Sequence, residues 1–208
     1  MSSKLGTSYR KSPAVLVSYD YVDIAEKTGY TTYYGYNMST SGATTYGLTR
    51  LQTFSQDIES SGASSAPYTI IKDLDFDLPF NITSIVNGTV RLNIPFHQTG
   101  GSASAYVFAR IIKWDGSTET VLGDTCSKEI VSANTPMIIN MEVDVAETKF
   151  TPDDTLRINL LLKGQANPAG EAAIYHDPQN RNGWKMTVGT DIGTTSFTAR
   201  VPFLLDVA

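Results

Sequence analysis

The chain has 208 residues but only one cysteine and two histidines, and charged residues make up 18% of it. Its single cysteine, Cys126, cannot form an intrachain disulfide, which is typical of proteins that fold in a reducing cytoplasm. We expect this thiol to be buried and inert. No apolar run reaches the roughly 20 residues that a membrane helix needs, and the first 20 residues lack the apolar core of a signal peptide. We therefore expect no membrane partner and no secretory leader.

Basic clusters and catalytic motifs are also missing. The chain carries 16 Lys and Arg against 21 Asp and Glu, a net charge of −5. Nucleic-acid binders neutralise phosphates with basic patches, so this composition argues against a nucleic-acid partner. The sequence has no glycine-rich phosphate loop, no HExxH zinc motif and no serine in a nucleophile-elbow pattern. We predict a protein without catalytic residues, cofactor or metal.

What the sequence does contain, from Tyr68 onward, is alternation of apolar and polar residues with a period of two. In residues 73–80 (DLDFDLPF), Leu and Phe share one face and Asp the other. This pattern predicts strands with one buried and one wet face. The same alternation recurs in residues 89–97, 138–145, 156–163 and 196–206. It places His97 on a wet face, whereas residues 105–114 (AYVFARIIKW) are apolar on both faces and predict a central strand.

Turn signals separate these segments. Asn-Gly at residues 87–88, Asp-Gly at 115–116, Pro-Asp-Asp at 152–154 and the stretch ANPAGE at 166–171 are typical of hairpins and tight turns. Helical spacing of apolar residues is not sustained anywhere beyond two turns. The sequence therefore predicts an all-β fold, an antiparallel two-sheet β-sandwich, with a jelly roll of about eight strands as the leading architecture.

Residues 1–50 differ in composition from residues 51–208, which hold the predicted sandwich domain. Eight of the eleven tyrosines precede Thr49, and residues 28–49 carry no charge. An aromatic, neutral segment rich in Tyr and Thr favours extended structure that packs against something else. Two interpretations stay open: an extended N-terminal arm that contacts a neighbouring subunit, or an ordinary pair of strands in the same domain. The candidate inter-subunit or capsid contacts are Tyr19, Tyr21, Tyr30, Tyr33, Tyr34, Tyr36 and Tyr46.

The segment AIYHDPQNR, residues 173–181, is the most reactive-looking part of the chain. Adjacent residues on a strand point to opposite faces, so His176 and Asp177 cannot act on one substrate atom without a turn between them. Pro178 supplies a turn, and we expect the pair to be its polar entry. A histidine next to an aspartate, without a nucleophile, does not predict catalysis.

Calcium and sugars are two further ligand classes for which the sequence contains candidate residues. Asp73, Asp75 and Asp77 share a strand face, but a straight strand spaces its carboxylates too widely to wrap a calcium ion, and we expect a solvated acidic face. Trp114 and Trp184 lie near predicted strand ends, where they could form platforms for sugars or pack at the rim of the sandwich.

Several segments together resemble one family. They are TTYYGYN (31–37), DLDFDLPFN (73–81), GTVRLNIPF (88–96), TKFTPDDTLRINLLL (148–162), YHDPQNR (175–181) and RVPFLLD (200–206). In this order they resemble the β-rich, jelly-roll decoration or cement proteins of tailed bacteriophages.

The resemblance implies a non-enzymatic virion protein that binds the outside of the capsid, contacts the major capsid protein and itself, and is often a trimer. An acidic protein assembled in the host cytoplasm fits the capsid exterior. Two alternatives remain: a head-fibre, tail or baseplate jelly-roll module that binds host-surface glycans, and an enzyme or metal-dependent lectin built on the same scaffold.

Overall fold

The computed structural model describes residues 28–40, 43–51, 59–64, 68–99, 104–131, 137–164, 167–176, 186–188, 191–193 and 196–204. Every regular element in these ranges is a strand, so the predicted all-β class is confirmed. The strands are β1 (Thr28–Thr40), β2 (Ala43–Thr49), β3 (Glu59–Ser64), β4 (Thr69–Pro79), β5 (Ser84–Thr99), β6 (Ser104–Trp114), β7 (Glu119–Cys126), β8 (Ile130–Val131), β9 (Met137–Phe150), β10 (Thr155–Gly164), β11 (Asn167–Tyr175), β12 (Met186–Val188), β13 (Asp191–Gly193) and β14 (Thr198–Leu204).

Twelve of these strands form one mixed sheet in the order β3-β11-β5-β14-β1-β2-β4-β10-β6-β7, with β9 paired to β5 and β8 to β6. The pairs are mostly antiparallel, but the expected antiparallel arrangement fails at one place, where β2 runs parallel to β4 over Tyr46–Phe76 and Gly47–Asp77. The described strands also outnumber the eight that were predicted. Alternation along one strand reveals its two faces but not its neighbours, so the sequence could not show the parallel pair.

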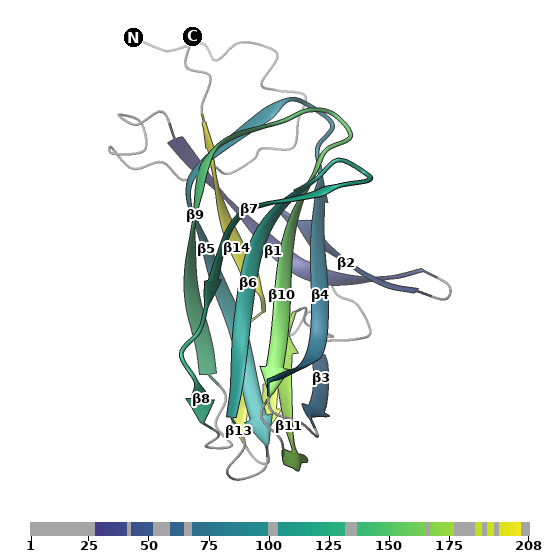
Figure 1. Cartoon of the computed structure of the whole chain (residues 1–208), viewed down its shortest axis with the longest axis vertical. Helices are drawn as coiled ribbons and strands as arrows, with labels where there is room; N and C mark the ends of the chain where they lie inside the picture. The colour runs from purple at the N-terminus through teal and green to yellow at the C-terminus, as the bar shows by residue number, and fades with distance from the viewer. Residues whose placement is uncertain are drawn as a thin grey trace, which may run out of the picture.

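The sheet curls into two layers that face each other (Figure 1). The first layer contains β9, β5, β14 and β1, and the second contains β7, β6, β10 and β4. At one side the layers meet where β7 approaches β9. A Cβ on Gly123 would lie 2.5 Å from the carbonyl oxygen of Asp144 and 2.9 Å from Val143 Cγ1. Only a residue without a side chain allows this approach.

One hydrophobic core lies between the layers and confirms the predicted alternation. On β5, the alternate residues Val90, Leu92, Ile94 and Phe96 are fully buried. Their counterparts on the second layer include Phe76 of β4. The strand predicted to be central, β6, indeed lies between β10 and β7. Burial of these side chains, at about 25 cal/mol per Å² of apolar surface, is the main force that holds the layers together.

Turn predictions succeeded where the turn residues close a hairpin. Asp115-Gly116 joins β6 to β7, with Gly116 at φ +93°, and Asp153 at φ +80° turns the chain between β9 and β10. Gly88 does not end a strand, although it follows Asn87. It sits inside β5 at φ +115°, where the pairing with β9 shifts register. Residues 167–171, predicted as a connection, belong to β11. A bulge and a hairpin turn can both require a glycine with positive φ, so the Asn-Gly dipeptide does not distinguish one from the other.

The neutral Tyr- and Thr-rich segment forms β1 and β2. β1 pairs with β14 from Thr28 to Tyr34 and then with β2 from Tyr34 to Thr40. Of the two interpretations left open, the pair of strands within the sheet describes residues 28–49. The remainder of the predicted arm, residues 1–27, lies outside the described residues.

Candidate functional site

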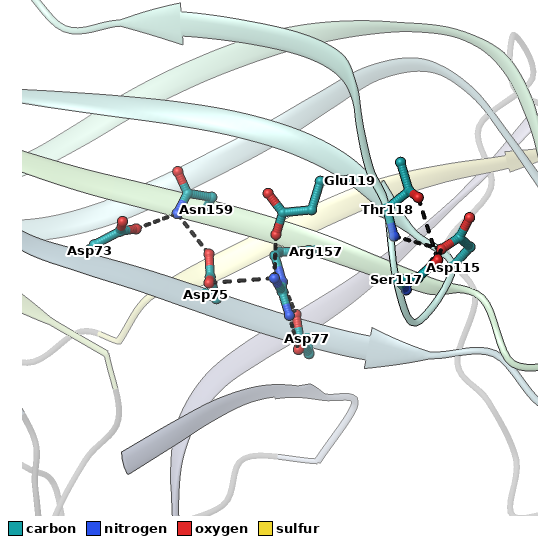
Figure 2. Close-up of polar contacts among 9 residues, drawn as sticks. All are labelled: Asp73, Asp75, Asp77, Asp115, Ser117, Thr118, Glu119, Arg157 and Asn159. Atoms are coloured by element: carbon teal, nitrogen blue, oxygen red, sulfur yellow. Dashed lines mark hydrogen bonds and ion pairs between the residues drawn. The ribbon is translucent and has the colours of Figure 1, made fainter. Parts of the chain in front are cut away.

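The outward face of the second layer, here called the carboxylate face, carries Asp73, Asp75, Asp77, Glu119 and Arg157 (Figure 2). Arg157 of β10 binds Asp77 of β4 with two hydrogen bonds, Nε to Oδ1 at 2.7 Å and Nη2 to Oδ2 at 2.9 Å. Its Nη1 also reaches Asp75 Oδ2 at 3.5 Å and Glu119 of β7. One guanidinium thus links β10 to its neighbour β4 and, across β6, to β7.

Asn159 occupies the rest of the acidic row. Its Nδ2 donates to Asp73 Oδ1 at 2.6 Å and to Asp75 Oδ1 at 2.7 Å (Figure 2). Burial raises the pKa of Asp75, an effect that the hydrogen bond from Asn159 and the charge of Arg157 oppose. Asp77, Asp75 and Glu119 raise the pKa of Arg157 further above its ordinary value, chiefly through the hydrogen bonds that Arg157 donates to Asp77.

This arrangement is a structural ion network. Each carboxylate of the row already accepts a hydrogen bond from a neighbouring strand, so the row is neither a plain solvated face nor a calcium loop. The described residues contain no group of three or more His, Cys, Asp or Glu side chains placed to hold a metal ion. Nor, in the described part of the chain, is there a helix long and apolar enough to cross a membrane.

Both histidines are buried, which corrects two predictions. His176, expected at the polar entry of a turn, is completely buried, with its ring centroid 5.2 Å from that of Tyr46 and 6.1 Å from that of Phe76. His97, expected on a wet face, is 7% exposed and lies 3.3 Å from the hydroxyl of Tyr175. Tyr175 of β11 packs against His97 on the outer side of β5. Alternation along β5 cannot reveal this contact, because it depends on another strand. Asp177 lies outside the described residues.

Three other predicted positions have three different outcomes. Cys126 is exposed at the end of β7, not buried, because its strand borders the sheet. Trp114 is half-buried and its ring lies 4.6 Å from the guanidinium carbon of Arg157, so it packs at the rim as one alternative expected. Trp184 is outside the described residues.

An open depression of about 410 Å³ lies where β2 diverges from β4. Its lining from the β1–β2 pair consists of Tyr36, Leu48 and Thr49. The second layer contributes Asp77 and Thr155. Its polar groups are few, and Asp77 already binds Arg157. The depression offers an aromatic ring and hydroxyls but no pair of groups for acid and base catalysis.

The candidate tyrosines separate into three groups. Tyr30, Tyr34 and Tyr36 are half-buried on one face of β1. Tyr33 is 3% exposed and packs edge-on against Phe203, and Tyr46 packs against Phe76. Tyr19 and Tyr21 lie outside the described residues. Among the described candidates, Tyr30, Tyr34, Tyr36 and the half-buried Tyr46 keep exposed surface, whereas Tyr33 does not.

Sequence reasoning missed one feature of the first layer. Arg91 of β5 and Arg200 of β14 are directly opposite each other on its outward face, which we call the arginine face. The two residues are far apart in the sequence, and the pattern of each strand shows only that each arginine points outward. Strand order and register, which place them side by side, were not predictable from those patterns.

No family model and no curated protein matches the sequence. Several solved structures are similar in fold. A CocE/NonD family hydrolase from Staphylococcus aureus aligns with TM-score 0.53 and 13% identity, over 85% of this chain and 37% of the hydrolase. An aminopeptidase from the marine sediment archaeon Thaumarchaeota archaeon aligns with TM-score 0.53 and 12% identity, over 86% of this chain and 37% of that chain. This chain therefore spans little more than a third of the length of these proteins.

Viral capsid proteins are also among the structural neighbours. A pentameric capsid protein from metagenomic phage sequences covers 63% of this chain and 70% of its own, at 17% identity and TM-score 0.18. At that TM-score the match carries no structural argument. The hydrolase matches show a shared fold alone, because a fold does not determine a reaction.

Proposed function

We propose that the chain is a non-enzymatic structural protein of a tailed-phage virion. In this proposal it is a decoration protein with a jelly-roll sandwich that binds the outside of the capsid, contacts the major capsid protein as a trimer and stabilises the shell. The sequence resemblance supplies the phage context, and the residue chemistry supports a role in binding rather than in turnover.

One observation carries the proposal: the two faces of the described sandwich differ in how they use polar groups. Both histidines are buried, and the carboxylate face satisfies its charges internally through Arg157. The arginine face, in contrast, presents Tyr30, Arg91 and Arg200 at the surface. Tyrosine and arginine are enriched where proteins bind one another. Three equivalent sites on a trimer would add avidity without any new type of contact.

The test is to purify particles of the phage that encodes the chain, with and without it. We expect the protein on intact heads, and we expect heads that lack it to open at a lower temperature and under milder osmotic shock. Absence from heads, or equal stability of both preparations, would overturn the proposal. Turnover of ester or peptide substrates by the purified chain would overturn its non-enzymatic part.

The depression at β2 and β4 favours a second candidate, a head-fibre or tail module that binds host-surface glycans. Its size falls in the range of small-molecule sites, and the Tyr36 ring beside Thr49 and Thr155 suits a sugar. Binding to a glycan array that Tyr36→Ala abolishes and Trp114→Ala does not would support this candidate. An array without signal would remove it.

A further inference from the structure

A row of side chains crosses four strands on the arginine face. In register, Arg91 of β5 is opposite both Glu142 of β9 and Arg200 of β14, and Arg200 is opposite Thr32 of β1. Residues directly opposite in an antiparallel pair point to the same side, and like charges in that position destabilise the pair. Two adjacent arginines are therefore an unfavourable choice for the fold alone.

The carboxylate nearest the pair neutralises only one of its members. Arg91 Nε lies 3.1 Å from Glu142 Oε1, with both side chains about half exposed or more. Arg200 forms no ion pair with a described residue, and its guanidinium carbon lies 5.2 Å from the ring centroid of Tyr30. The guanidinium carbon of Arg91 lies 5.5 Å from the same centroid. Both guanidinium carbons thus lie within 5.5 Å of one ring centroid, and they belong to residues that are opposite each other in register.

The surroundings of the pair are polar and almost neutral. On one side the next row contains Asn93 and Thr198, which are joined by a hydrogen bond of 3.2 Å from Nδ2 to Oγ1, and Tyr34 lies opposite Thr198. On the other side Thr89 donates to Asp144 at 2.6 Å. No further Lys or Arg extends the patch along these rows, so it lacks the basic track that a phosphate backbone requires. A pair of arginines surrounded by Tyr, Asn, Thr and one further carboxylate, Asp144, is typical of a protein interface.

From this geometry we infer that Arg91 and Arg200 bind a carboxylate of a protein partner. An aspartate or glutamate of a capsid subunit would lie between the two guanidinium groups, with the Tyr30 ring beneath them. Arginine suits this role because its planar fork matches a carboxylate in two hydrogen bonds. The chain as a whole has a net charge of −5 and would repel an acidic partner, so the attraction must come from a local site such as this pair. The inference rests on the proposed function and names the residues by which this face attaches.

The first experiment measures attachment of the full chain to heads that lack it, by co-sedimentation. We expect Arg200→Gln to bind on the order of tenfold more weakly than the wild type. Arg200→Lys should recover part of the loss, because lysine keeps the positive charge but lacks the planar guanidinium group. The matched control is Arg110→Gln, which removes an exposed arginine from β6 in the other layer and should bind within twofold of wild type. Thermal unfolding of Arg200→Gln should occur at the wild-type temperature or higher, because a repulsive pair is removed.

Equal binding of Arg200→Gln and wild type to heads would overturn the inference and leave the proposed function standing. If the wild type does not bind heads, the proposed function fails, and a second experiment still decides the inference. The ¹⁵N-labelled chain is titrated with the peptide acetyl-Glu-Gly-Glu-amide and with inorganic phosphate at matched ionic strength. The peptide should shift the Nε–Hε signals of both arginines. A stronger response to phosphate, or none to the peptide, would overturn it.

Discussion

The two outward faces of the curled sheet carry arginine in opposite ways. On the carboxylate face Arg157 meets Asp77, Asp75 and Glu119, and its guanidinium group links β10 to β4 and β7. On the arginine face Arg91 and Arg200 are opposite each other, and one carboxylate, Glu142 of β9, pairs with Arg91 alone. Pairing Arg157 with carboxylates favours the folded state. Placing Arg91 opposite Arg200 does not, and such a pair is typical of a binding surface. The same residue type therefore has different roles in the two layers.

The largest effect is expected where the network depends on one side chain. Arg157→Ala leaves Asp77, Asp75 and Glu119 close together without their shared cation and removes the contact with Trp114. We expect it to lower the free energy of unfolding by about 3 kcal/mol, because the remaining carboxylates lose their compensation. Urea denaturation measures this loss. Arg110→Ala is the control and should change stability by less than about 0.5 kcal/mol; equal effects would show that Arg157 is not the centre of the face.

The seam between the layers should give the next largest effect. Gly123→Ala places a Cβ 2.5 Å from the carbonyl oxygen of Asp144, so β7 and β9 must separate. We expect a loss of about 2 kcal/mol, typical of forced overpacking, measured by thermal unfolding. Gly116→Ala is a matched control for the side chain itself: it has no atom within 4 Å, although its φ of +93° adds backbone strain. A Gly123→Ala variant as stable as wild type would mean that the two layers do not touch there.

Asp154 lies in the turn that connects the first layer to the second, and it predicts acid sensitivity. The amide of Thr151 donates to its Oδ2 at 2.6 Å, and Lys113 Nζ lies 3.0 Å away. These contacts, the amide hydrogen bond first, lower the pKa of Asp154. Its contribution is therefore complete above the unfolded value near pH 3.9 and is lost as pH falls through the lower folded value. Asp154→Asn should cost about 1 kcal/mol at pH 7 and should flatten the stability profile below pH 4.

Asp75 predicts the smallest effect, with the opposite sign. Burial raises its pKa, so its charged form is less favourable in the folded protein than in the unfolded chain. Stability from this group rises as pH falls through the folded value, and at neutral pH its charge is a burden. Asp75→Asn should therefore unfold at the wild-type temperature or slightly above it at pH 7, with no advantage below pH 4. A clear loss of stability at pH 7 would show that its bond to Arg157 outweighs burial.

Local features of this structure were predictable and long-range ones were not. Alternation identified the buried side of β5 and the central position of β6, because side-chain direction depends on the strand alone. Burial of His97 and His176, exposure of Cys126 and the opposition of Arg91 and Arg200 depend on which strands are neighbours. The sequence contains that information only through contacts between distant segments, so pattern reasoning on single strands did not reach it.

The position of β14 has a consequence for biosynthesis. This strand lies between β5 and β1, and Leu204 pairs with Thr28, so the β14–β1 pair joins segments made at very different times. A nascent chain must keep β1 and β5 apart, with their hydrogen-bonding edges exposed, until translation has reached residues 198–204. Long sequence separation slows such pairing, and waiting edges invite association with other chains. Ribosome-bound intermediates of this protein should therefore be the species most in need of a chaperone.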